Sequence, residues 1–167
     1  SFQLEQVEDF RPEVALLLNV AEDHLDRHFS MDNYLRIKAR LFENQRSDDY
    51  AIIQWEARQR LKQIEVSVAA NTLTFSESEK TADLYLDENL IKSRLPGWPS
   101  TVLDLNRCNL KGSHNAANLM ATLLAGRVLK LPFEEMIATA TELQSGAHRC
   151  EFVAEWNGVE FYNDSKA

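Results

Sequence analysis

The sequence predicts an α/β domain with a mainly parallel sheet flanked by helices, followed by the first hairpin of a second domain. Three observations lead to this fold class. Apolar, strand-like runs alternate with helix-like segments between residues 12 and 69. Two helical patterns follow between residues 115 and 143. Near the end, Asn157-Gly158 separates two short β-like runs, which is typical of a two-residue hairpin turn.

The first third of the chain contains the expected parallel strands. Residues 12–20 (PEVALLLNV) are almost continuously apolar, which is typical of a strand buried on both faces, and we place this strand at 14–20. The other elements expected here are strands at 50–55 and 64–69, a helix at 31–44 that Ser30 caps, and a short helix at 56–61.

The pattern changes after residue 71. Short β-like runs at 72–75, 84–86 and 101–105 predict a small antiparallel patch. Helices are expected at 115–129 and 132–143, with Gly146 just beyond the second helix. The hairpin strands are expected at 150–156 and 159–162. We predict a domain boundary near residues 145–147, so that 1–146 form one domain and 147–167 begin another.

Composition limits the classes of function. The chain has 167 residues, 44% of them hydrophobic and 26% charged, as in an ordinary globular protein. The net charge of −8 argues against nucleic acid as the main partner, because phosphate-backbone binding needs clustered Lys and Arg. No apolar run reaches the roughly 18–20 residues of a membrane span, and the first residues lack a signal-peptide pattern. Cys108 and Cys150 are isolated, so we expect them unpaired in a reducing cytoplasm.

Neither end of the chain looks like the end of a domain. The sequence starts with Ser1 rather than Met, and it stops at Ala167 directly after an apparent strand. We therefore expect a piece of a longer protein.

The densest polar cluster is the segment 19–28, which follows the first expected strand. Open α/β sheets bind ligands beyond the carboxyl ends of their strands, and Asp and His side chains there can hold a divalent metal or a phosphate-bearing substrate. A solvated loop is the alternative interpretation. By itself the cluster also allows a metal-dependent phosphohydrolase that uses Asp23, His24, Asp26 and His28.

Lys38 has an unusual place in the helix expected at 31–44. The apolar positions of this helix are Met31, Tyr34, Leu35, Leu41 and Phe42. Lys38 lies at the centre of that apolar stripe. One interpretation is a side chain that extends past the apolar face to water. The other is a partly buried amine whose pKa is lowered by desolvation and which reacts with carbon dioxide to form a metal-binding carbamate. The loop that contains His24 lies only fourteen positions upstream, close enough for the two residues to share a metal site under the second interpretation.

The strongest expected helix opens with the segment 110–118. Ser113 is a reasonable cap for this helix. Asn115 and Asn118 are three positions apart, so both amides lie on one face near the helix start. Carboxamides donate and accept hydrogen bonds together, which suits the edge of an adenine ring. Simple capping and local hydrogen bonding are the alternative.

Charged residues bracket the final hairpin. Arg149 precedes its first strand, and Asp164 and Lys166 follow its second strand. The hairpin brings these ends together, which would provide groups for the ribose and phosphates of a nucleotide. Taken singly, such pairs are more often surface salt bridges.

Several motifs in a fixed order resemble the Mur ligase family. They are Ser-Phe-Gln-Leu-Glu at 1–5, Asn-x-x-x-Asp-His-Leu-Asp-Arg-His at 19–28, Tyr-x-x-x-Lys at 34–38, Gly-x-His-Asn-x-x-Asn at 112–118, His-Arg-x-Glu at 148–151 and Asn-Asp-Ser-Lys-Ala at 163–167. The first and last resemble the members that add D-glutamate to UDP-N-acetylmuramoyl-L-alanine. The resemblance covers the whole chain. It implies that 1–146 are the central ATP-binding domain without its P-loop part, and that 147–167 begin a Rossmann-like C-terminal ligase domain.

The resemblance also implies an ADP-forming ligase of peptidoglycan synthesis that acts as a cytoplasmic monomer with ATP and Mg²⁺. ATP would phosphorylate the alanine carboxylate, and the D-glutamate amine would displace phosphate from the acyl phosphate. The residue roles that the resemblance implies are these: His24 binds substrate and magnesium, carbamylated Lys38 orients that magnesium, Asn115 and Asn118 face adenine, and Arg149, Asp164 and Lys166 reach ATP or the acidic substrates.

Parts of the family pattern are missing from this sequence. It contains no Gly-rich loop ending in Gly-Lys-Thr, and the magnesium-binding Glu of the family lies just before the motif that begins at Ser1. We therefore expect the 167-residue chain to be inactive by itself. A non-catalytic module whose acidic surface binds a protein is a further alternative, which an upstream P-loop would exclude.

Overall fold

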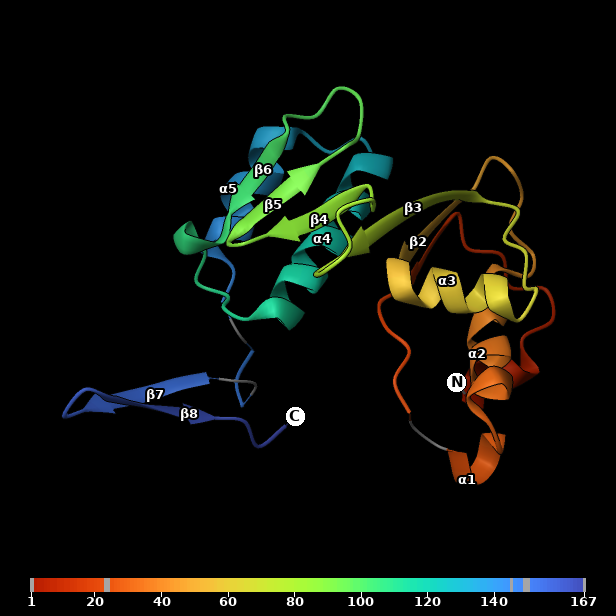
Figure 1. Ribbon diagram of the computed structural model, residues 1–167, viewed down its shortest axis with the longest axis horizontal. Helices are drawn as coiled ribbons and strands as arrows, with labels where there is room; N and C mark the ends of the chain where they lie inside the picture. Colours follow the sequence, from red (N-terminus) through yellow and green to blue (C-terminus); the bar gives the residue numbers. More distant parts are fainter. Residues whose placement is uncertain (1, 23–24, 145, 149–150, 167) are drawn as a thin grey trace.

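A computed structural model describes residues 2–22, 25–144, 146–148 and 151–166, with only the backbone of Phe2, Leu25 and Asp26. Its main body is a six-stranded sheet in the order β1-β2-β3-β4-β5-β6 (Figure 1). The strands are β1 (Val14–Leu17), β2 (Tyr50–Gln54), β3 (Asn71–Ser76), β4 (Leu84–Asp87), β5 (Leu90–Ser93) and β6 (Thr101–Asp104). The pairs from β1 to β4 are parallel, and β5 runs antiparallel to both neighbours. The mainly parallel α/β fold is thus confirmed.

Helices cover both faces of the parallel part. Helices α2 (Met31–Ala39) and α3 (Trp55–Gln63) cover one face, and α4 (Ser113–Val128) covers the other. The remaining helices are α1 (Leu25–His28) and α5 (Phe133–Glu142), and the 3₁₀ turns are η1 (Phe2–Gln6), η2 (Arg40–Phe42) and η3 (Leu105–Arg107). Strand β2 shows the division of the core. Ile52 belongs to the apolar cluster under α4, whereas Ala51 and Ile53 belong to the cluster under α2 and α3. Alternate side chains of a strand point to opposite faces, so a strand buried on both sides is apolar throughout.

Strand β1 is shorter than the expected span 14–20 and lies at the edge of the sheet. Ala15 and Leu17 are buried on the α2/α3 side, and Val14 and Leu16 pack against the cluster on the α4 side. The expected helix 31–44 is also shorter: α2 ends at Ala39 and continues as the 3₁₀ turn η2. The cap was correct, because the Ser30 hydroxyl accepts a hydrogen bond from the Asn33 amide.

The strand expected at 64–69 was wrong. Glu65 takes the left-handed conformation (φ 59°), and the Val66 amide donates to the Leu61 carbonyl, so this stretch first closes the end of α3. Its apolar residues Ile64, Val66 and Val68 pack against the α2/α3 cluster without joining the sheet. The parallel strand comes afterwards, at Asn71–Ser76.

Residues 72–75 were consequently assigned to the wrong part of the sheet. They belong to β3, which pairs in parallel with β2 and with β4. The antiparallel patch consists of β4, β5 and β6, and β5 was not predicted. The four-residue strand Leu90–Ser93 is too short for a clear alternation of apolar and polar residues, so the sequence carries little signal for it.

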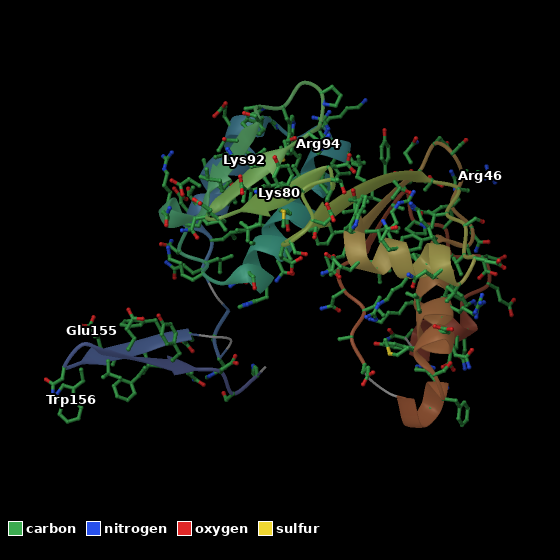
Figure 2. The ribbon with its side chains drawn as sticks, viewed as in Figure 1. Arg46, Lys80, Lys92, Arg94, Glu155 and Trp156 are labelled. Atoms are coloured by element: carbon green, nitrogen blue, oxygen red, sulfur yellow. The ribbon has the colours of Figure 1, made fainter. Side chains whose placement is uncertain are left out.

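The final hairpin, β7 (Glu151–Trp156) and β8 (Val159–Asn163), forms a separate two-stranded sheet, drawn in blue in Figure 1. Asn157 and Gly158 both have positive φ, as a tight two-residue hairpin turn requires. Figure 2 shows Trp156 at the tip of the hairpin, and its side chain is mostly exposed. The division into domains 1–146 and 147–167 stays a prediction.

Two expectations about the whole chain concern cysteines and membranes. Cys108 is a buried free thiol, and burial raises its pKa; Cys150 lies outside the described residues. Within the described part of the chain, no helix is long and apolar enough to cross a bilayer.

Candidate functional site

The first candidate region follows the carboxyl end of β1. Two of its predicted residues, Asp23 and His24, lie outside the described residues, as does the side chain of Asp26. The fourth, His28, ends the short helix α1 and is buried, with only 1% of its side chain exposed. The structure therefore leaves the metal and substrate roles of His24 as predictions.

Glu5 anchors this region to the start of the chain. Arg27 donates to both of its carboxylate oxygens, from Nε at 3.1 Å and from Nη2 at 2.5 Å. The Nδ1 atom of His28 lies 3.5 Å from Glu5 Oε1. The hydrogen bonds from Arg27 lower the pKa of Glu5, and the charges of Arg27 and His28 act in the same direction. Arg40 donates to the backbone carbonyls of Glu5 and Val7, so the same segment is also held to the end of α2.

Lys38 lies at the apolar side of α2, as the periodicity predicted. It is half-buried, and its Nζ atom lies 4.9 Å from the centre of the Tyr34 ring, one helical turn earlier. The buried Tyr34 ring in turn stacks with His28, with ring centres 5.2 Å apart and planes inclined by 27°. A cationic amine is attracted to the face of an aromatic ring. Glu5, His28, Tyr34 and Lys38 thus form one continuous line of contacts, which we call the Lys38 stack.

This geometry gives no support to a phosphohydrolase built on the 19–28 cluster. His28, the member of that cluster whose side chain is described, is buried and lies against Glu5 and Tyr34. Within the described residues, no group of three His, Cys, Asp or Glu side chains is arranged to hold a metal.

The second candidate region is the start of α4. Ser113 is the first helical residue rather than the cap, because Gly112, with φ of 90°, occupies the capping position. Asn115 is half-buried, and its Nδ2 atom donates to the Lys111 carbonyl at 2.7 Å. Asn118 is exposed on the same face of the helix. One hydrogen-bonding group of the Asn115 side chain, Nδ2, is therefore used locally. Within the described part of the chain, the Asn118 side chain makes no hydrogen bond.

The third region is the base of the hairpin, where the predicted convergence of the two ends is present. The Lys166 amide donates to the His148 carbonyl at 2.9 Å, and Asn163 Nδ2 lies 2.8 Å from His148 Nδ1. The His148 amide also donates to Glu151 Oε2 at 2.8 Å. Asp164 and Lys166 are exposed at this base. Arg149 lies outside the described residues.

A cavity of about 610 Å³ joins the start of α4 to the hairpin. It is lined by Asn109, Lys111, Asn115, Gln144, Glu151, Phe152 and Tyr162. Phe152 and Tyr162, opposite each other on β7 and β8, form an edge-to-face pair with ring centres 5.8 Å apart. Sites for small ligands are commonly cavities of roughly 300–1,000 Å³ with apolar walls and a few polar groups. The two aromatic residues were not predicted, because their exposure to a cavity depends on how the hairpin lies against α4.

The structure thus groups the predicted residues into two places. Asn115 lies at the cavity beside the hairpin, whereas α2, with Lys38, lies on the opposite side of the molecule in Figure 1.

A mainly parallel sheet with helices on both faces places the chain among the open α/β folds. Comparison with known proteins gives the family. Residues 1–126 match the Mur ligase middle domain. The chain belongs to the Mur ligase family.

Individual relatives share sequence over nearly the whole chain. A protein of Koribacter versatilis named UDP-N-acetylmuramoylalanine–D-glutamate ligase is 36% identical over 168 residues, covering 100% of this chain and 37% of its own length. A protein of the same name from Desulfitobacterium hafniense is 38% identical, covering 99% of this chain and 37% of its own length. The chain therefore spans little more than a third of the length of these relatives.

Solved structures agree on the fold. A crystal structure of MurF from Acinetobacter baumannii matches with a TM-score of 0.68 at 21% identity, over 92% of this chain and 34% of that one. The MurF ligase of Thermotoga maritima in complex with ADP matches with a TM-score of 0.64 at 23% identity, over 92% and 35%. At these identities the similarity establishes the fold.

Proposed function

We propose that this chain is the middle part of an ATP-dependent ligase that adds D-glutamate to UDP-N-acetylmuramoyl-L-alanine during peptidoglycan precursor synthesis. The observation that carries the proposal is the 36–38% identity, over 99–100% of the chain, to proteins named as that ligase. The activity would belong to a longer protein, because those relatives are almost three times as long as the segment that they share with this chain. We propose that this protein is a cytoplasmic monomer.

The proposed reaction has two steps. The γ-phosphoryl group of ATP passes to the alanine carboxylate, which gives an acyl phosphate and ADP. The D-glutamate amine then attacks the acyl carbon, the C–O bond to phosphate breaks, and the nitrogen loses a proton as the amide forms. Phosphoryl transfer depends on positioning and on neutralising charge, so the protein must orient both substrates and the metal.

Magnesium would supply charge neutralisation at the transferring phosphoryl group. It prefers oxygen ligands, and a lysine carbamate provides them: Lys–NH₂ and CO₂ give Lys–NH–COO⁻ and a proton. Lys38 fits this role in one respect, since its amine lies half-buried against Tyr34 instead of extending freely into water. His24 is the second proposed ligand of the metal and also a contact of the UDP-linked substrate.

The proposed nucleotide site is the cavity between α4 and the hairpin. Asn115 lines this cavity, and Asn118 lies on the same helix face. These two amides would face the adenine edge. Arg149, Asp164 and Lys166 would reach the ribose and phosphates of ATP or the acidic substrate from the hairpin base.

An assay of the full-length protein tests the proposal. We expect ADP and phosphate to form only when ATP, Mg²⁺, UDP-N-acetylmuramoyl-L-alanine and D-glutamate are all present. L-Glutamate, D-alanine and meso-diaminopimelate are matched controls for the amino acid. Each is expected to react at less than about a hundredth of the rate with D-glutamate. An incorrect amino acid leaves polar groups of the site without hydrogen-bond partners, which costs several kcal/mol of transition-state stabilisation. The isolated 167-residue chain is expected to be inactive. Hydrolysis of simple phosphoesters without an amino acid would instead support a phosphohydrolase.

A further inference from the structure

The aromatic side chain of Phe152 lines the cavity between the start of α4 and the hairpin. Phe152 is the second residue of β7 and is 55% exposed. Lys111 and Asn115 line the same cavity from the other side, at the start of α4. A large apolar side chain that is open to a cavity among polar groups is typical of a ligand site, because the ligand provides the burial that the fold does not.

Tyr162 limits the movement of the Phe152 ring. The two residues are cross-strand partners, and their rings meet edge to face with centres 5.8 Å apart and planes inclined by 73°. The Tyr162 hydroxyl in turn donates to Glu160 Oε2 at 2.8 Å. In an edge-to-face pair one ring presents its edge to the face of the other, so Phe152 keeps at least one ring face outside this contact. A planar ligand can stack on that face.

Two carboxamides lie in the same cavity as the Phe152 ring. Asn115 uses Nδ2 to donate to the Lys111 carbonyl, whereas its Oδ1 makes no hydrogen bond within the described part of the chain. Gln144, which follows α5, also lines the cavity, and its side chain makes no hydrogen bond to any residue that the structure describes. Carboxamides donate and accept in one plane, as the edges of nucleic-acid bases do. An aromatic face beside such groups fits a flat heterocycle with hydrogen-bonding edges.

We propose that the ring of Phe152 is the surface on which the base of the bound nucleotide stacks. This inference rests on the proposed function, since the use of this cavity as the nucleotide site belongs to that proposal. Stacking on an aromatic ring tolerates any base, because every base has a π face. Phe152 therefore contributes affinity for the nucleotide, and the choice of adenine is left to the amides at the base edge.

Calorimetric titration of the full-length protein separates the ring from its packing. Phe152→Leu keeps an apolar side chain but removes the ring, and Phe152→Tyr keeps the ring. Phe161→Leu is the matched control, because Phe161 is 48% exposed and the alternation of side chains places it on the opposite face of the hairpin. We expect Phe152→Leu to weaken ATP and ADP binding by about tenfold, and the other two variants to bind within about twofold of the wild type. Inorganic tripolyphosphate, which has no base, should bind equally to all four proteins.

Nuclear Overhauser effects between ADP and the protein give a readout that does not depend on affinity or turnover. In deuterated full-length protein with protonated phenylalanine, the adenine H2 and H8 protons of bound ADP should show cross-peaks to one phenylalanine ring. These cross-peaks are expected to disappear in Phe152→Leu and to persist in Phe161→Leu.

The outcomes separate the two proposals. A Phe152→Leu protein that binds ATP as the wild type does, with unchanged adenine cross-peaks, would overturn the stacking role and leave the ligase proposal intact. Equal weakening of ATP and tripolyphosphate binding would also overturn it, because that result indicates a displaced hairpin instead of a lost stacking surface. A wild-type protein that binds ATP with these cross-peaks but forms no ADP in the presence of both other substrates would refute the proposed function and retain the stacking role.

Discussion

The guanidinium group of Arg11 donates two hydrogen bonds to the Asp49 carboxylate, from Nε to Oδ2 at 2.8 Å and from Nη2 to Oδ1 at 2.9 Å. Arg11 precedes β1, and Asp49 directly precedes β2, so this pair joins the starts of two neighbouring parallel strands. The Asp49 side chain is only 4% exposed and also accepts from the Arg46 amide at 2.7 Å. These contacts, first the Arg11 hydrogen bonds and then the Arg46 amide, lower the pKa of Asp49.

The lowered pKa of Asp49 predicts an acid-dependent loss of stability. A carboxylate whose pKa is lower in the folded than in the unfolded state stabilises the fold above its unfolded pKa, about 3.9, and this contribution disappears as the pH falls through the lower, folded pKa. We expect Asp49→Asn to lower the melting temperature by several degrees at pH 7 and by less at pH 3, which lies below the unfolded pKa. Thermal unfolding at both pH values measures this, with the exposed Asp9→Asn as the control, since Asp48 itself contacts Arg11. An equal loss at both pH values would contradict the assignment.

Phe29 predicts a gain of stability. It is 86% exposed and has φ of 63°, a left-handed conformation that costs a non-glycine residue roughly 1–2 kcal/mol. Phe29→Gly relieves this cost, while the larger entropy of unfolded glycine takes back about 0.5–1 kcal/mol. The expected net gain is about 0.5–1 kcal/mol in urea unfolding. Phe29→Ala removes the same ring but keeps the strained backbone, so it should show no such gain; a similar gain in both variants would point to loss of the exposed ring instead.

Several elements of the fold could be predicted from the sequence, and others could not. Strand β2 was found because Ala51, Ile52 and Ile53 are apolar on both faces, and α4 and α5 were found because their apolar residues repeat with helical spacing. Such patterns can be recognised in the sequence because they depend on the secondary structure and burial of one segment alone. The stretch containing Val66 misled for the same reason: its alternation reflects packing against a helix, and no local rule separates that from pairing in a sheet.

Contacts between distant residues carry no such pattern. The position of Lys38 followed from the periodicity of α2, but the contact between Glu5 and His28 joins positions 23 residues apart and depends on how η1 folds back on α1. The cavity wall of Phe152 and Tyr162 likewise depends on the placement of the hairpin. For the site as a whole, the sequence indicated the residues, and folding determined their neighbours.

Asn118 offers a specific test of the nucleotide site. In the full-length protein, Asn118→Ala should weaken ATP binding by up to roughly a hundredfold, equivalent to about 1–3 kcal/mol, because a donor and an acceptor to the adenine edge are lost. Binding of the UDP-linked substrate should not change. Calorimetric titration with each ligand measures both. Asn118 suits this test better than Asn115, whose amide also bonds Lys111 at the helix start. Unchanged ATP affinity would show that Asn118 is an exposed residue of α4 that does not contact adenine.

Lys38 carries the decisive prediction for the chemistry. In the full-length protein, Lys38→Ala should reduce ligation by about a thousandfold or more, as expected when a metal in the transition state loses an anionic ligand worth several kcal/mol. Acetate should partly restore the rate by placing a carboxylate in the vacated space, whereas chloride at the same ionic strength should not. Wild-type activity should fall when dissolved carbon dioxide is removed and return when bicarbonate is added, because the carbamate forms reversibly. Initial rates of phosphate release measure all three effects. Near-normal turnover by Lys38→Ala would show that Lys38 has no role in the mechanism. If Lys38→Ala is inactive but acetate does not restore its rate, and bicarbonate does not change the wild-type rate, Lys38 would be essential but not as a carbamate.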